Sequence, residues 1–142
     1  MELLKVHPPF VHFAIGLSFA LLVLELYYRF TGKQPDRLHL IFTLLSSLFI
    51  VGAAASGYVA YESQEEKLHK IQIFEVHESL GMFLGAYGVV LLAVRLGFER
   101  LGFLRKIFTF MVLFGFLAVL FQGSLGGSVV YDHMVKPWLE QP

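Results

Sequence analysis

The chain has no cysteine and few charged residues, and each shortage excludes a class of protein. Without cysteine there are no disulfides, no thiolate-ligated zinc or iron–sulfur sites and no covalently attached c-type haem. Only 15% of the 142 residues are charged, well below the quarter that soluble domains usually carry. The formal net charge is zero, which gives no support for nucleic-acid binding.

Long apolar runs take the place of the missing charge. Four of them, residues 10–30, 38–60, about 74–96 and 107–131, fill most of the sequence. Crossing a bilayer takes about 20 residues of helix, and lipid leaves the backbone no partner outside its own helix. The sequence therefore predicts an all-α, polytopic membrane protein, a four-transmembrane-helix bundle that forms one domain over residues 1–142.

The basic residues are unevenly divided between the two sides of the membrane. One side carries seven of them, namely Arg29, Lys33, Arg37, Arg95, Arg100, Arg105 and Lys106. The other side, which holds both chain termini, carries four, namely Lys5, Lys67, Lys70 and Lys136. The positive-inside rule places the richer side in the cytoplasm. We therefore expect a multi-pass protein of the cytoplasmic (inner) membrane, with both termini on the outer, periplasmic side.

Two short patterns occur twice, in the same order along the chain. A histidine is followed four residues later by glycine at His12 and Gly16, and again at His77 and Gly81. Gly57 precedes Tyr61-Glu62 by four residues, as Gly127 precedes Tyr131-Asp132. Internal symmetry is one way in which membrane proteins build a central site. The patterns predict that the bundle consists of two repeated helix hairpins, residues 8–62 and 73–132.

The repeated histidines suggest a cofactor. His12 and His77 each lie about one turn into a span, at matched depth, and imidazole is a common axial ligand of haem iron. Gly16 and Gly81 lie on the same helix faces and would leave room for a flat ligand. We predict one non-covalent haem b near the outer face, with His12 and His77 as the iron ligands. Two histidine ligands suit electron transfer rather than oxygen chemistry.

Other polar residues are weaker candidates. His7 and His133 fall at the outer interface, where they could ligate a second cofactor, bond a haem propionate or be solvated. Tyr61 and Tyr131 either form part of the aromatic belt or bond a cofactor edge. Glu25 is expected to reach the membrane surface or to pair with Arg29, and His39 to lie at the cytoplasmic interface.

These residues resemble an uncharacterised bacterial family of small four-helix membrane proteins that carry a domain of unknown function. The resemblance covers nearly the whole chain and is carried by His7-Pro8-x-x-Val11-His12-Phe13-x-Ile15-Gly16, Gly57, His77 and Gly126-Gly127-x-Val129-Val130-Tyr131-x-His133. Ala14 replaces an expected proline and Met134 an expected glycine, and neither change removes a candidate ligand. Fusion of some members to Rieske or cytochrome-like domains implies electron transfer, and the architecture is similar to that of b-type cytochromes.

The sequence therefore favours an electron-transfer or anchor subunit over a stand-alone enzyme. Its expected partners are the lipid bilayer, a quinone or an outer-side redox protein of cytochrome or Rieske type, and a larger membrane complex. One alternative is a non-redox structural or assembly subunit of a respiratory complex. Another is a metal-ion carrier that uses His7, His12, His77 and His133, which is disfavoured because Glu25 alone suggests a polar path in the cytoplasmic half.

Overall fold

The protein folds into long helices that run the length of a narrow bundle. The structure, a computed structural model, describes residues 6–62, 68, 71–98 and 101–136. In these ranges it contains four long helices, α1 (His7–Thr31), α2 (Arg37–Glu62), α4 (Gln72–Gly97) and α5 (Gly102–Val130), and no strand. All four are long and apolar enough to cross a membrane. The predicted all-α, four-transmembrane-helix class is confirmed.

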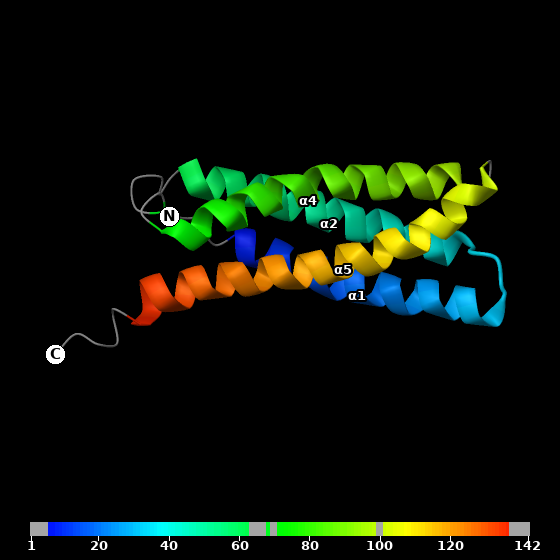
Figure 1. Ribbon diagram of the computed structural model, residues 1–142, viewed down its shortest axis with the longest axis horizontal. Coiled ribbons are helices and arrows are strands. Elements are labelled where there is room, and N and C mark those ends of the chain that lie inside the picture. Colours follow the sequence, from blue (N-terminus) through cyan, green and yellow to red (C-terminus); the bar gives the residue numbers. More distant parts are fainter. Residues whose placement is uncertain (1–5, 63–67, 69–70, 99–100, 137–142) are drawn as a thin grey trace.

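The four helices form a closed ring in which each one runs antiparallel to the next (Figure 1). Extensive contacts join α1 to α2, α2 to α4, α4 to α5 and α5 back to α1. The starts of α1 and α4 therefore share one end of the bundle with the last residues of α2 and α5. A π-helical turn, Tyr131–Val135, extends α5 at this end.

Local sequence sets the helix boundaries between which these contacts form. Proline occupies the first turn of α1, where the missing N–H is harmless. Gly32 ends α1 in the left-handed conformation, with φ of 69°, which glycine adopts without strain. The Asp36 carboxylate then begins α2 by accepting the backbone N–H of Leu38 at 2.9 Å and of His39 at 3.3 Å.

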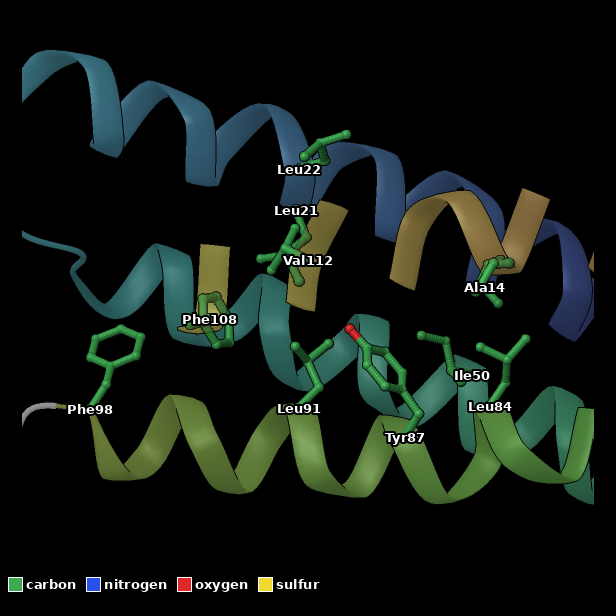
Figure 2. Packing of buried hydrophobic residues seen from close by; sticks show 12 residues of the cluster. Ala14, Leu21, Leu22, Ile50, Leu84, Tyr87, Leu91, Phe98, Phe108 and Val112 are labelled. Carbon is green, nitrogen blue, oxygen red and sulfur yellow. The ribbon is translucent and has the colours of Figure 1, made fainter. Parts of the chain in front are cut away.

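The core is a thin column between the helices, and most large apolar side chains lie outside it. Figure 2 shows Phe98 and Phe108 close together at one end of the column and Ala14, Ile50 and Leu84 at the other. In contrast, Phe30 is 83% exposed and Phe110 is 74% exposed. Apolar side chains on the outer surface are expected of a bundle whose solvent is lipid.

The buried positions of the two hairpins recur at nearly constant spacing. In α1 and α4 they recur seventy positions apart, at Ala14 and Leu84, Leu21 and Leu91, and Glu25 and Arg95. In α2 and α5 they recur sixty-nine positions apart, at His39 and Phe108, Thr43 and Val112, Ser46 and Gly115, and Ile50 and Val119. This spacing of seventy pairs His77 with His7, whereas the pattern that suggested repeated hairpins 8–62 and 73–132 paired His77 with His12, sixty-five positions before it.

Candidate functional site

Polar side chains gather at both ends of the core column. At the end where α1 begins, the cluster that we call the histidine end consists of His7, Ser56, His77 and Gln122, one residue from each helix. His7 Nδ1 lies 3.1 Å from Ser56 Oγ, and Gln122 Nε2 donates to the backbone carbonyl of His77 at 2.8 Å. All four of these residues are partly buried.

Glycines on neighbouring helices make room for these side chains. A Cβ atom on Gly57 would lie 3.0 Å from His7 Cε1, and one on Gly126 would lie 2.9 Å from His77 Cε1. A Cβ atom on Gly81 would lie 3.0 Å from Gln122 Nε2. Each of the three polar groups thus packs on a glycine of the adjacent helix, and the two imidazoles do so in corresponding places of the two hairpins.

The hydrogen bonds at the histidine end determine where one proton lies. The Ser56 hydroxyl donates to the Ala53 carbonyl at 3.1 Å, so its oxygen accepts from the N–H of His7 Nδ1. His7 Nε2 then carries the lone pair. Two buried atoms, His77 Nδ1 and Gln122 Oε1, have no hydrogen-bond partner within the described part of the chain. Because such atoms are costly to leave unpaired, they mark a place where water or a ligand would bond.

The structure brings only some of the candidate residues to this end of the core. His12 is exposed, and its Nδ1 lies 2.7 Å from the Pro8 carbonyl of its own helix. Five residues turn a helix by about 140° beyond a full turn, so His7 and His12 face different directions. Gly16 is also exposed, and no atom would lie within 4 Å of a Cβ there. It is therefore His7 that α1 presents to the interior.

The remaining candidates lie at the surface or near it. Tyr131 is 59% exposed, and His133 in the same π-helical turn is exposed too. Tyr61 is partly buried and stacks on Phe74, with ring centroids 5.3 Å apart. The repeated Gly-Tyr pattern thus places its two tyrosines in different surroundings.

The opposite end of the column contains a buried charged cluster, which we call the arginine end. It consists of Glu25, His39, Arg95 and Arg105, again one residue from each helix. Glu25 and His39 are fully buried, and Arg95 is 2% exposed. Arg105 is 17% exposed in its side chain and connects the cluster to the surface.

The geometry of the arginine end fixes the tautomer of His39. Arg95 Nε donates to His39 Nδ1 at 2.9 Å, and because a guanidinium has no acceptor, Nδ1 must carry the lone pair. His39 Nε2 therefore carries the proton and donates it to Glu25 Oε2, which lies 2.9 Å away. His39 is neutral in this arrangement and joins a carboxylate to a guanidinium.

Further donors complete the surroundings of the carboxylate. Glu25 Oε1 accepts from the Thr109 hydroxyl at 2.6 Å and pairs with Arg105. The Phe98 ring lies beneath both guanidinium groups, with the Cζ atoms of Arg95 and Arg105 at 4.3 and 5.4 Å from its centroid. Charge-assisted hydrogen bonds and ring contacts thus replace the water that these groups lose on burial.

The contacts of three residues at this end differ from those expected from the sequence. Glu25 neither reaches the surface nor pairs with the exposed Arg29, but pairs with Arg105. His39 and Arg95, which were expected near the cytoplasmic surface, are both buried between the helices. The available signal was that Glu25 and Arg95 are ionisable residues within apolar spans, where such residues are retained for a purpose.

The connection between α1 and α2 lies outside the spans, and its ionisable groups are tuned by tyrosines. The Tyr28 hydroxyl holds the pKa of the Asp36 carboxyl below its ordinary value, and the N–H groups at the start of α2 act in the same direction. Lys33 Nζ donates to the Tyr27 hydroxyl at 2.7 Å, and this bond raises the pKa of the lysine.

A closed ring of four membrane-crossing helices with a polar cluster at each end defines a small polytopic membrane protein. The chain belongs to the family described as "Predicted membrane protein (DUF2231)", whose model matches residues 4–137. This confirms the family of unknown function that the motifs indicated. No curated protein and no solved structure matches the chain. Within the described residues, no three His, Cys, Asp or Glu side chains come together to hold a metal ion.

Proposed function

We propose that this protein is an electron-transfer subunit of the cytoplasmic membrane, and that one non-covalent haem b lies at the histidine end with His7 and His77 as iron ligands. The observation that carries the proposal is the hydrogen bond from His7 Nδ1 to Ser56. A histidine that ligates a metal through one ring nitrogen usually donates the other N–H to a fixed acceptor. His7 has this arrangement, with Nε2 left to bind iron.

His77 supplies the second imidazole in this proposal. The two rings belong to α1 and α4, which lie across the bundle from each other. The buried, unpartnered His77 Nδ1 and the glycines beneath both rings fit a site that is completed by a bound group. When bound, haem would supply one-electron redox chemistry, which the chain's own side chains lack.

The side of the membrane on which electrons would be exchanged follows from the expected orientation. Without the buried Arg95, the membrane side at the arginine end still carries six basic residues against four, so the histidine end is expected to face outward. A haem there would exchange electrons with an outer-side redox protein or with quinone in the bilayer. The subunit would then act within a larger oxidoreductase.

A second function, a non-redox assembly subunit, is favoured by the close packing of the same rings. The two imidazoles already fill the space above Gly57 and Gly126 at contact distance. In this alternative, the unpartnered atoms of His77 and Gln122 would bind water. The metal-ion carrier is not supported, because His12 and His133 are exposed and do not join His7 and His77 in the core.

A reduced-minus-oxidised spectrum of protein purified from haem-replete cells tests the proposal. We expect b-type bands in the wild type and their loss in His7→Ala and in His77→Ala. His12→Ala is the matched control, since His12 is exposed on the same helix, and it should keep the bands. Absence of bands in the wild type would favour the assembly subunit, whereas loss in His12→Ala with retention in His7→Ala would restore the ligand pair expected from sequence.

A further inference from the structure

A row of buried polar side chains begins at the arginine end and stops near the middle of the bundle. On α2 it consists of His39, Thr43, Ser46 and Ser47, none of them more than 3% exposed. Their spacing places them on one face of the helix, toward the core. The next buried position along this face is Ile50, which is apolar. The row therefore spans only the half of the membrane that adjoins the arginine end.

The fold itself does not require polar side chains at these positions. The corresponding buried positions of α5 are Phe108, Val112 and Gly115, which are all apolar. On α5 the second hairpin thus packs the same part of the core with apolar residues alone, and the one hydroxyl that it places against them, that of Tyr87 on α4, donates to the Met111 carbonyl. Burying a polar group costs free energy unless its hydrogen bonds are replaced, so the row on α2 calls for a reason other than packing.

The end of the row near the middle of the bundle has room for water. Ser18 Oγ and Ser46 Oγ lie 3.1 Å apart in the wall of a cavity of about 10 Å³, which is large enough for about one water molecule. The hydroxyl of the adjacent Ser47 is buried and has no hydrogen-bond partner in residues 6–62, 68, 71–98 and 101–136. Ser47 does not line this cavity, and its unpaired hydroxyl marks a second place near the same end of the row where a water molecule would bond.

At the arginine end of the bundle, the row meets the protein surface. A pocket of about 460 Å³ at the arginine end is lined by Gln34, Pro35, Phe98, Gly102 and Arg105. From this pocket, hydrogen bonds lead from Arg105 to Glu25 and from Glu25 to His39. The Thr43 hydroxyl donates to the His39 carbonyl at 2.9 Å and continues the row toward Ser46.

We propose that this row is a water-containing proton inlet, open at the arginine end and closed beyond Ser46, in which Glu25 and His39 exchange the proton. A proton fits better than a metal cation, because cations need about six oxygen ligands and the cavity offers three hydroxyl-bearing residues, Ser18, Ser46 and Tyr87. Anions would meet the Glu25 carboxylate directly behind Arg105. Imidazole, carboxylate and water are the groups that relay protons inside membranes. The inlet does not depend on haem at the other end.

The exchange step is set by the groups that face His39. These are Glu25 and Tyr28 from α1, Arg95 and Phe98 from α4, and Phe108 from α5. A hydronium ion in the row gives one proton to His39 Nδ1 and becomes a water molecule, as Arg95 Nε moves off that nitrogen. His39 Nε2 then releases its proton to Glu25 Oε2. The imidazole is neutral again in the other tautomer, and the network has gained one proton on Glu25.

The absence of cysteine allows a direct test of water access. Ser46→Cys and Ser47→Cys are introduced singly, and membranes are treated with Ag⁺ in chloride-free buffer from one side at a time. Thiols left unreacted are then counted with a fluorescent maleimide after denaturation. Reporter fusions assign the two sides beforehand. Ile50→Cys, buried further along the same face, and Leu44→Cys, exposed to lipid on the same helix, are the controls.

We expect both serine-derived thiols to react at least tenfold faster from the arginine-end side than from the other side, and faster than either control. Adding Thr43→Val to Ser47→Cys should abolish the reaction, because an isosteric apolar side chain interrupts the row while filling the same volume. Equal reaction rates of Ser46→Cys, Ser47→Cys and Ile50→Cys, or reaction from the histidine-end side alone, would overturn the inlet.

A second measurement addresses the proton. In histidine-selective ¹⁵N spectra, the His39 signal is assigned by its loss in His39→Gln. We expect the bound Nε2 proton to exchange within minutes of transfer into D₂O. Persistence of that proton for hours, while the thiols react with Ag⁺, would overturn the exchange role of Glu25 and His39.

Discussion

The two hairpins bury corresponding positions with opposite chemistry. In hairpin 8–62 the inward face of α2 carries His39, Thr43 and Ser46, whereas in hairpin 73–132 the same face of α5 carries Phe108, Val112 and Gly115. The charged residues are divided in the same way, since Glu25 on α1 corresponds to Arg95 on α4. Backbone geometry and burial are thus compatible with either chemistry, so packing alone does not explain the polar side chains of α2.

The histidine end gives the opposite result. There the two hairpins agree, because His7 packs on Gly57 as His77 packs on Gly126. A pair of like groups from corresponding places suits a symmetric ligand, whereas a carboxylate matched by a guanidinium suits a charge relay. The two hairpins thus place like imidazole–glycine pairs at the histidine end and residues of opposite charge, Glu25 and Arg95, at the arginine end.

Removing Glu25 should cause the largest loss of stability among the variants of the two hairpins. Glu25→Ala leaves Arg105 and the His39–Arg95 pair without their common acceptor, and breaking a buried ion pair destabilises a protein by about 3–5 kcal/mol. Thermal denaturation in detergent should show a correspondingly large drop in Tm. Leu26→Ala, at the adjacent and partly exposed position, is the control and should change Tm little. A similar Tm for both variants would show that the network contributes no stability.

Substitutions at the glycines beneath the imidazoles test whether the two hairpins are equivalent. Gly126→Ala places a methyl group 2.9 Å from His77 Cε1, and Gly57→Ala places one 3.0 Å from His7 Cε1. Overpacking of this kind costs about 1–3 kcal/mol, and we expect both variants to fall in that range. Gly127→Ala is the matched control, since nothing lies within 4 Å of its Cβ position, and it should be neutral or stabilising. Unequal losses of stability in the Gly57 and Gly126 variants would show that the two hairpins are not equivalent at this end.

The sequence was sufficient to predict the helices but not which side of each helix faces inward. Span length and the requirement for internal hydrogen bonds determine four helices in any lipid environment. In a soluble protein, polar residues would then mark the outer face. Here both faces are apolar, so His12 and His7 could not be distinguished by their neighbours, and the H-x-x-x-G pattern favoured the exposed His12.

The arginine end could not be assembled from sequence because its members come from four helices. Glu25 has a local candidate partner in Arg29, four residues away, and such pairs are common on helix surfaces. Its actual partners, His39 and Arg105, lie on α2 and α5, which are one and three long helices further along the chain. Glu25 and Arg95 are seventy positions apart, like the other corresponding positions of α1 and α4. Because the two side chains have opposite charges, a search for similar motifs does not pair them.

Making α2 resemble α5 should have a small effect on stability. The variant Ser18→Ala, Thr43→Val, Ser46→Ala and Ser47→Ala removes the hydroxyls of the row together with the serine that bonds to one of them. Replacing both partners of a hydrogen bond by apolar groups is nearly neutral, so we expect a change within about 1 kcal/mol. Thermal denaturation in detergent measures this change in stability. A loss as large as that of Glu25→Ala would show that the row is structural, contrary to the comparison with α5.

The smallest expected effect lies in the connection between α1 and α2, where the pKa of the Asp36 carboxyl is lowered chiefly by the Tyr28 hydroxyl. A lowered pKa means that the folded state binds this proton less readily than the unfolded state. The stabilisation is therefore complete above the unfolded value of about 3.9 and is lost as pH falls through the lower, folded value. We expect the Tm difference between wild type and Asp36→Ala to be constant near pH 6 and to shrink below about pH 4.

Asp36→Asn separates the charge from the capping bond in the same experiment. The amide oxygen can still accept the N–H of Leu38, so this variant should lose less Tm than Asp36→Ala at every pH. Because asparagine does not titrate, the Tm difference between wild type and Asp36→Asn isolates the contribution of the charge and should also shrink on acidification. A difference that stays constant from pH 6 to pH 3 would mean that Tyr28 and the helix start do not favour the ionised carboxylate.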